Sequence, residues 1–180
     1  MQRSRITITL QEQIVKDIDR MVDGERIRNR SHAIEFLLTQ TMKPKLQTAL
    51  ILAGGRGVRM KPYTTEIPKS LLPISGKPIL EHQLDLLRSS DIREVVILIG
   101  HLGEKIRNHI GDGNRLGLRV SYIEQEQREI GTGYALHLAT HILRDKSFLM
   151  MYGDVLADIN IRDFIHHHAN SGAIAPVALT

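Results

Sequence analysis

The feature that most constrains the fold is a regular alternation of apolar runs and helical segments that begins at Ala49. The apolar runs have the length of buried strands, and the segments between them have helical periodicity. Strands that alternate with helices form a mostly parallel sheet with helices on both faces. The expected strands are 49–55, 93–100, 118–124 and 147–154, with 173–179 as a weaker candidate, and the expected helices are 79–90, 103–110, 132–143 and 161–170.

The sequence AGGRGVRM, residues 53–60, follows directly on the first of these strands. Its glycines allow positive φ angles and a close approach of the backbone to a ligand. Exposed N–H groups in such a turn bind anions, and Arg59 adds a guanidinium group that matches phosphate oxygens. Ligands of parallel sheets bind beyond the carboxyl ends of the strands, where both this loop and the YGD sequence ending at Asp154 are expected. We therefore expect a polyphosphate site, and the alternative is a surface turn whose charges face water.

The loop differs from the two common phosphate-binding motifs. The chain has no G-x-x-x-x-G-K-[ST] sequence, and GGRGVR does not match G-x-G-x-x-G. Pro62 would also interrupt the helix that a dinucleotide-binding fold begins here. The longer run LAGGRGVRMKPYTTEIPKSLLPISGKPIL, residues 52–80, resembles the signature of the sugar-phosphate nucleotidyltransferases, which include mannose-1-phosphate guanylyltransferases and glucose-1-phosphate thymidylyltransferases.

This resemblance implies a Rossmann-like nucleotidyltransferase fold and the reaction of a nucleoside triphosphate with a sugar 1-phosphate to give an NDP-sugar and pyrophosphate. Arg59 would hold the departing β- and γ-phosphates, and Lys69 would bridge the α-phosphate and the sugar phosphate. Asp154 matches the family's Mg²⁺-binding aspartate, whereas Val58 occupies a position that is usually Ser or Thr. The implied nucleotide-binding residues are Ala53, Gly54, Gly55, Gly57, Arg59, Lys69, Glu126, Gly131 and Thr132.

Glu126 lies where relatives of this family often carry Gln or Glu before the base-binding glycine. A carboxylate only accepts hydrogen bonds, so it favours the N–H groups of guanine, or the amino group of cytosine, over uracil and thymine. The expected nucleotide is therefore GTP, with CTP next. The alternative for Glu126 is an exposed charge on a loop.

Residues 5–10, RITITL, alternate strictly, which is the pattern of a half-buried strand. Ile6, Ile8 and Leu10 lie on one side, and Arg5, Thr7 and Thr9 on the other. Two short helices follow, separated near Gly24, and Ser31 is the expected N-cap of the second. A unit of this size buries too little apolar surface alone. We therefore expect it to form a homodimer in which the strands of two copies pair.

Residues 3–43 resemble the ribbon-helix-helix family of DNA-binding proteins, the MetJ/Arc type. The resemblance implies that Arg5, Thr7 and Thr9 read base edges of duplex DNA, and that the helix start at Ser31 holds a DNA phosphate. Residues 1–48 hold nine Lys/Arg and six Asp/Glu, an excess that favours an anionic partner. The alternative is a dimerisation module with a polar outer face. The expected domains are thus 1–45 and 46–180.

Composition narrows the class of protein. An apolar content of 42% supports a real core, and the lack of cysteine excludes disulfides and thiolate metal sites. The chain shows neither a signal peptide nor an apolar run of membrane-spanning length, so a cytoplasmic protein without membrane association is expected. The adjacent histidines 166–168 would point in different directions from a helix and make a poor metal site.

The resemblance to the nucleotidyltransferases stops at the sequence AIAPVALT, residues 173–180. Catalytic domains of that family normally continue with strands that carry a second metal-binding aspartate and the residues that read the sugar. The sequence therefore suggests a C-terminally truncated member of the family. Three hypotheses follow: an active guanylyltransferase, a nucleotide-responsive DNA-binding regulator, and an inactive remnant.

Overall fold

The computed structural model describes residues 6–42, 46–125, 131–144 and 146–178. The chain divides into two compact units, Met1–Lys45 and Leu46–Thr180. All of the strands in the described ranges belong to the larger unit, while the smaller one is helical.

A four-stranded sheet with the order β5-β4-β1-β6 forms the centre of the larger unit. Every neighbouring pair in it is parallel, and β1 is paired on both edges. This sheet confirms the predicted α/β architecture with a parallel sheet. The strands are β1 (Thr48–Ala53), β4 (Glu94–Ile99), β5 (Arg119–Glu124) and β6 (Phe148–Tyr152).

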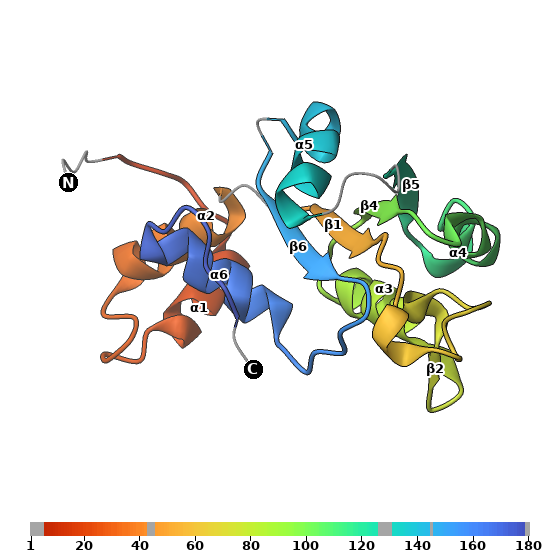
Figure 1. The fold of residues 1–180 in the computed structure, drawn as a ribbon. Coiled ribbons are helices and arrows are strands. Elements are labelled where there is room, and N and C mark those ends of the chain that lie inside the picture. The colour runs from red at the N-terminus through yellow and green to blue at the C-terminus, as the bar shows by residue number, and fades with distance from the viewer. Residues whose placement is uncertain (1–5, 43–45, 126–130, 145, 179–180) are drawn as a thin grey trace. The chain divides into compact units, whose positions relative to one another are not determined.

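Helices cover both faces of the sheet, as Figure 1 shows. Alternate side chains of a strand point to opposite faces, so β1 contributes Ile51 to the core that includes α3 and α4, and Leu50 to the core under α5. The two central strands β1 and β4 are buried on both faces and read as continuous apolar runs, whereas the edge strand β5 alternates buried and exposed residues. The helices are α3 (Ile79–Ser89), α4 (Gly103–Ile110), α5 (Thr132–Leu143) and α6 (Ile161–Ser171).

Short elements that the apolar pattern does not predict lie between β1 and α3. They are the 3-10 turns η1 (Val58–Met60) and η2 (Lys69–Leu71) and a small hairpin of β2 (Pro73–Ile74) and β3 (Lys77–Pro78). The hairpin turns at Ser75 and Gly76, both of which have positive φ, as a two-residue type I′ connection requires. A third 3-10 turn, η3 (Asn114–Leu116), precedes β5.

The weaker strand prediction at the end of the chain is wrong over its described part. Residues 173–178 form no strand, and Ile174 is 100% exposed. No neighbouring strand pairs with this segment in the described residues, and Pro176 has no N–H to contribute to a ladder. Among the described helices, none is long and apolar enough to cross a membrane.

The smaller unit contains α1 (Glu12–Met21) and α2 (Arg30–Met42). Two aspartates organise their connection. The Asp23 carboxylate accepts three backbone N–H groups, and that of Ile27 does most to hold the pKa of Asp23 below its usual value. Asp19 pairs with Arg30 through two bonds of 2.5 and 2.7 Å, and the hydrogen bond from Arg30 lowers the pKa of Asp19. The helices are thus joined by polar contacts as well as by packing.

One prediction for this unit needs correction, and another stays a prediction. Residues 6–10 form no strand in the single chain, but the predicted strand depends on pairing with a second copy and is not tested by the single chain. Ser31 lies inside α2 rather than at its N-cap, because the side chain of Asn29 accepts the N–H of His32 at 2.9 Å and takes the capping role. Arg5 lies outside the described residues, and Thr7 and Thr9 lie on the exposed segment before α1.

Candidate active site

The register of the sheet brings the ends of its strands to one level. Ala53 pairs with Ile99, and Ile99 pairs with Glu124, so that Gly54, Gly100 and Gln125 follow side by side. A Cβ atom on Gly100 would come within 2.8 Å of the carbonyl oxygen of Gly54. The two backbones therefore touch where β1 and β4 end, and a side chain at position 100 would push them apart.

The loop after β1 is shaped by a left-handed turn at Gly57, whose φ is 61°. Its carbonyl oxygen accepts the N–H of Met60 at 2.9 Å and the hydroxyl of Thr64 at 2.7 Å. Thr64 is buried, and a Cβ atom at position 57 would lie 2.9 Å from its methyl carbon. Glycine is required here for its φ angle and for this contact. The turn leads into η1, which carries Arg59.

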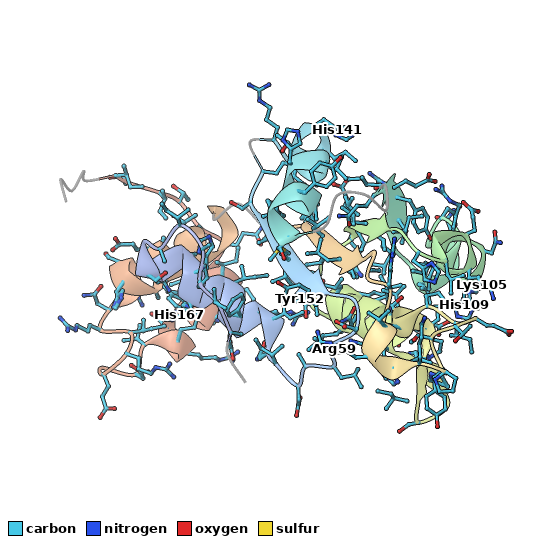
Figure 2. All side chains as sticks on the ribbon, in the orientation of Figure 1. Arg59, Lys105, His109, His141, Tyr152 and His167 are labelled. Carbon is cyan, nitrogen blue, oxygen red and sulfur yellow. The ribbon has the colours of Figure 1, made fainter. Side chains whose placement is uncertain are left out.

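A cavity of about 480 Å³ lies beyond the carboxyl ends of the strands. Residues 53–56 line it where β1 ends, and His101 and Gln125 line it beyond β4 and β5. Tyr152 is the last residue of β6, and Gly153 and Asp154 follow it. Arg59 and Tyr152, both labelled in Figure 2, line it from different segments of the chain. Gly131, the N-cap of α5, and Thr132, its first residue, also line the cavity, and a helix N-terminus favours anions. Its size is that of an ordinary small-molecule site.

Positive charge dominates the described lining of this cavity. Arg56, Arg59 and Lys69 are cationic, and Asp154 is the one carboxylate among the lining residues that the structure describes. Lys69 donates a hydrogen bond to the Asp154 carboxylate, and each side chain is about one third exposed, at 34% and 32%. The remaining cationic excess and the backbone N–H groups suit a polyanion.

The predicted nucleotide- and metal-binding residues line this one cavity, with two exceptions. Gly57 is absent from the described lining and acts on the loop's shape instead, while Glu126 lies outside the described residues. The sequence reasoning missed Arg56, Ser70, Gln125 and Tyr152. Gln125 and Tyr152 could have been found, because Gln125 directly follows the expected strand 118–124 and Tyr152 lies near the end of the expected strand 147–154. The predicted residues that line the cavity are Ala53, Gly54, Gly55, Arg59, Lys69, Gly131, Thr132 and Asp154.

Residues 48–180 match the nucleotidyl transferase family, and the chain belongs to that family. It is 33% identical to a UTP–glucose-1-phosphate uridylyltransferase of Synechocystis sp. over 139 residues, which is 72% of this chain and 36% of the relative. It is 31% identical to mannose-1-phosphate guanyltransferase beta-B of Xenopus laevis over 135 residues, 73% of this chain and 37% of the relative. These two relatives differ in the base of their nucleotide.

The fold is also found in solved structures. The crystal structure of HddC from Yersinia pseudotuberculosis superposes with a TM-score of 0.61 at 26% identity, covering 69% of this chain and 55% of that one. The chain spans little more than a third of the length of the two curated relatives above. The similarity therefore establishes the family and the fold of the matched part.

The contact between Gly57 and Thr64 gives a prediction for stability. Gly57→Ala should lower the free energy of unfolding by about 2 kcal/mol or more, because it combines a left-handed alanine with an overlap on the Thr64 methyl group. Thr64→Ser removes that methyl group and retains the hydroxyl. In the Thr64→Ser background, the same glycine substitution should cost about 1 kcal/mol less. Urea denaturation of the four proteins measures this coupling, and strictly additive costs would show that the two residues do not constrain each other.

Proposed function

We propose that this chain carries the nucleotide-binding site of a sugar-1-phosphate nucleotidyltransferase, and that it takes part in transfer of a nucleotidyl group from an NTP to a hexose 1-phosphate. The observation that carries the proposal is the convergence of Arg59, Lys69 and Asp154 with the Gly54–Gly55 backbone in one cavity. In the reaction an oxygen of the sugar phosphate attacks the α-phosphorus of the NTP. The bond from the α-phosphorus to the bridging oxygen breaks, and pyrophosphate leaves.

The chain's own groups match the charges of this reaction. The attacking phosphate oxygen is already anionic, so no general base is needed, and catalysis depends on alignment and on neutralisation of charge. The N–H groups of Gly54 and Gly55 would cradle the triphosphate, and Arg59 would hold the departing β- and γ-phosphates. Lys69 would lie between the α-phosphate and the sugar phosphate and reduce their repulsion.

The residues present also fit a Mg²⁺ ion that arrives with the nucleotide. Mg²⁺ prefers oxygen ligands and is commonly bound by one or two carboxylates together with substrate phosphates. Asp154 supplies one carboxylate at the cavity, and the described residues hold no cluster of three or more acidic or histidine side chains that would bind a metal alone. Asp154 would hold the ion, which supplies charge neutralisation at the phosphates. Lys69 would then exchange its bond to Asp154 for one to phosphate.

We propose that the nucleotide is GTP, with CTP as the next candidate, because the carboxylate of Glu126 can only accept hydrogen bonds. The relatives do not decide this point, since they include a uridylyltransferase and a guanyltransferase. Gln125 at the cavity wall offers a competing contact, because an amide both donates and accepts and would suit uracil or thymine equally. Preference for UTP or dTTP would assign base reading to Gln125 rather than Glu126.

The nucleotide site is tested by isothermal titration calorimetry with each NTP. We expect GTP to bind in the presence of Mg²⁺, and binding to weaken on addition of EDTA. Arg59→Ala and Lys69→Ala should each weaken it roughly 10- to 100-fold, because each removes a charge-assisted hydrogen bond worth about 1.5–3 kcal/mol. Lys146→Ala is the control, since Lys146 pairs with Glu94 at the opposite ends of the strands.

Two outcomes would count against this assignment. If no NTP binds, the glycine-rich loop is a structural turn and the cavity has another ligand. If Lys146→Ala weakens binding as much as Lys69→Ala, the effect reflects net charge rather than the site. Pyrophosphate release with mannose 1-phosphate and with glucose 1-phosphate then tests transfer itself.

A second function is favoured by the smaller unit. Ile6, Ile8 and Leu10 are 72%, 48% and 36% exposed in the single chain, on a segment that reads as an amphipathic strand. Exposed apolar residues at a spacing of two are explained if the same segment of a second copy pairs with them. We therefore propose that this unit forms a ribbon-helix-helix homodimer and binds duplex DNA through Arg5, Thr7 and Thr9, with a phosphate near Ser31. Such a protein would be a DNA-binding regulator that responds to the nucleotide.

Pairing of the strands predicts that the full chain sediments as a dimer at micromolar concentration. Ile8→Asp should shift it to a monomer, because a carboxylate would have to be buried between the paired segments. Ile174→Asp is the matched control, since Ile174 is fully exposed in the larger unit. A wild-type monomer under these conditions would contradict the proposed dimer.

DNA binding predicts an affinity that falls steeply with salt, because phosphate contacts release counterions. Replacing Arg5 by Ala should cost about 1–3 kcal/mol on a preferred sequence and relax the sequence preference, if Arg5 contacts a base. Lys16→Ala, on α1, should leave the preference unchanged. Fluorescence anisotropy with a panel of duplexes measures both effects. Equal affinity of the wild-type protein for all duplexes would leave dimerisation as the role of the unit.

A further inference from the structure

The inner face of α3 carries a buried amide among leucines. Leu80, Leu84 and Leu87 are fully buried, and Gln83 between them is only 2% exposed. Its Nε2 atom donates to the carbonyl oxygen of Tyr152 at 2.7 Å and to that of Val155 at 2.5 Å. These carbonyls belong to the residues on either side of Gly153 and Asp154. One side chain of α3 therefore holds both sides of the turn that carries the cavity's carboxylate.

The chemistry of the amide suits this place. A primary amide presents two N–H donors on one nitrogen and remains neutral. Lys or Arg at this position would bring a buried charge close to Asp154 and compete with Lys69 for its carboxylate. Leu or Met would fill the space and leave both carbonyls without this donor. Gln donates hydrogen bonds to both carbonyls of the turn and leaves the net charge of the cavity unchanged.

The other end of the same amide argues against a role in packing alone. The Oε1 atom of Gln83 is buried and has no hydrogen-bond partner among the described residues. A buried polar atom without a partner is unfavourable, and leucine at this apolar position would avoid that cost. The benefit of Gln83 must therefore lie in what its N–H groups hold.

The turn is held from β1 as well. The N–H of Gly153 donates to the carbonyl oxygen of Leu52 at 2.9 Å, and a Cβ atom at Gly153 would come within 3.0 Å of Ala53. Asp154 thus follows Gly153, which packs on β1, and precedes Val155, whose carbonyl is bound by Gln83 of α3. We propose that Gln83 is a positioning residue for Asp154: it fixes the turn so that the carboxylate stays in the cavity and binds Mg²⁺ with the nucleotide. The binding part of this inference rests on the proposed function.

The test compares Gln83→Met with Leu87→Val in the full chain. Both change the buried face of α3, but only the first removes the donors to the turn. Calorimetry with GTP should show affinity in Mg²⁺ reduced about tenfold or more by Gln83→Met, as for other residues that orient a metal ligand, with little change in EDTA. Leu87→Val should leave both affinities near the wild-type values. Gln83→Asn, which keeps two donors on a shorter side chain, serves as the second variant if the Met protein does not fold.

Amide hydrogen exchange without any nucleotide separates this inference from the proposed function. Gln83→Met should speed exchange in residues 153–156, and Leu87→Val should not. If the wild-type chain binds no NTP, the proposed function fails, while the exchange experiment still decides whether Gln83 holds the turn. Wild-type exchange in Gln83→Met, or the same acceleration in Leu87→Val, would overturn the inference. Accelerated exchange with undiminished Mg²⁺-dependent affinity would also overturn it, because the turn would then not position Asp154.

Discussion

The pairing of β1 with β4 on one side and with β6 on the other is the interaction on which the rest of the larger unit depends. It pairs β1 along both edges and sets the level at which each strand ends. Because the strands are parallel, the segments that leave them emerge at one edge, and the cavity forms there. A slip of one register position between β1 and β4 would separate Gly54 from Gly100. The same slip between β1 and β6 would carry Asp154 away from Lys69.

Around this edge, neutral groups hold the backbone while charged groups face the cavity. The hydroxyl of Thr64 binds the carbonyl of Gly57, and the amide of Gln83 binds the carbonyls beside Asp154. Both side chains are buried and uncharged. The backbone around the cavity is therefore held by side chains that add no charge to it. Such pre-organisation lowers the cost of binding a polyanion.

Much of this arrangement could be predicted from the sequence. Apolar runs predicted β1 and β4, which are buried on both faces, and the pattern of 118–124 and 147–154 predicted β5 and β6. The glycine-rich loop predicted that the cavity lies at the carboxyl ends of the strands. Gln83 could not be predicted, since an amide on a helix reads as a surface residue until the turn it binds is placed against it. The strand expected at 173–179 failed because pairing depends on a neighbour rather than on local pattern. Capping by Asn29 in place of Ser31 was a choice between residues of similar propensity that lie two positions apart.

The central claim is that the edge of the sheet formed by the carboxyl ends of its strands binds a nucleoside triphosphate. Glycine amide resonances are well separated in a ¹H–¹⁵N spectrum, and the chain has glycines at both ends of the strands. Titration with Mg²⁺ and GTP should shift Gly54, Gly55, Gly131 and Gly153, which line the cavity, and leave Gly111, Gly113 and Gly117, near the start of β5, unmoved. Shifts confined to the second group, or no shifts at saturating nucleotide, would contradict the account.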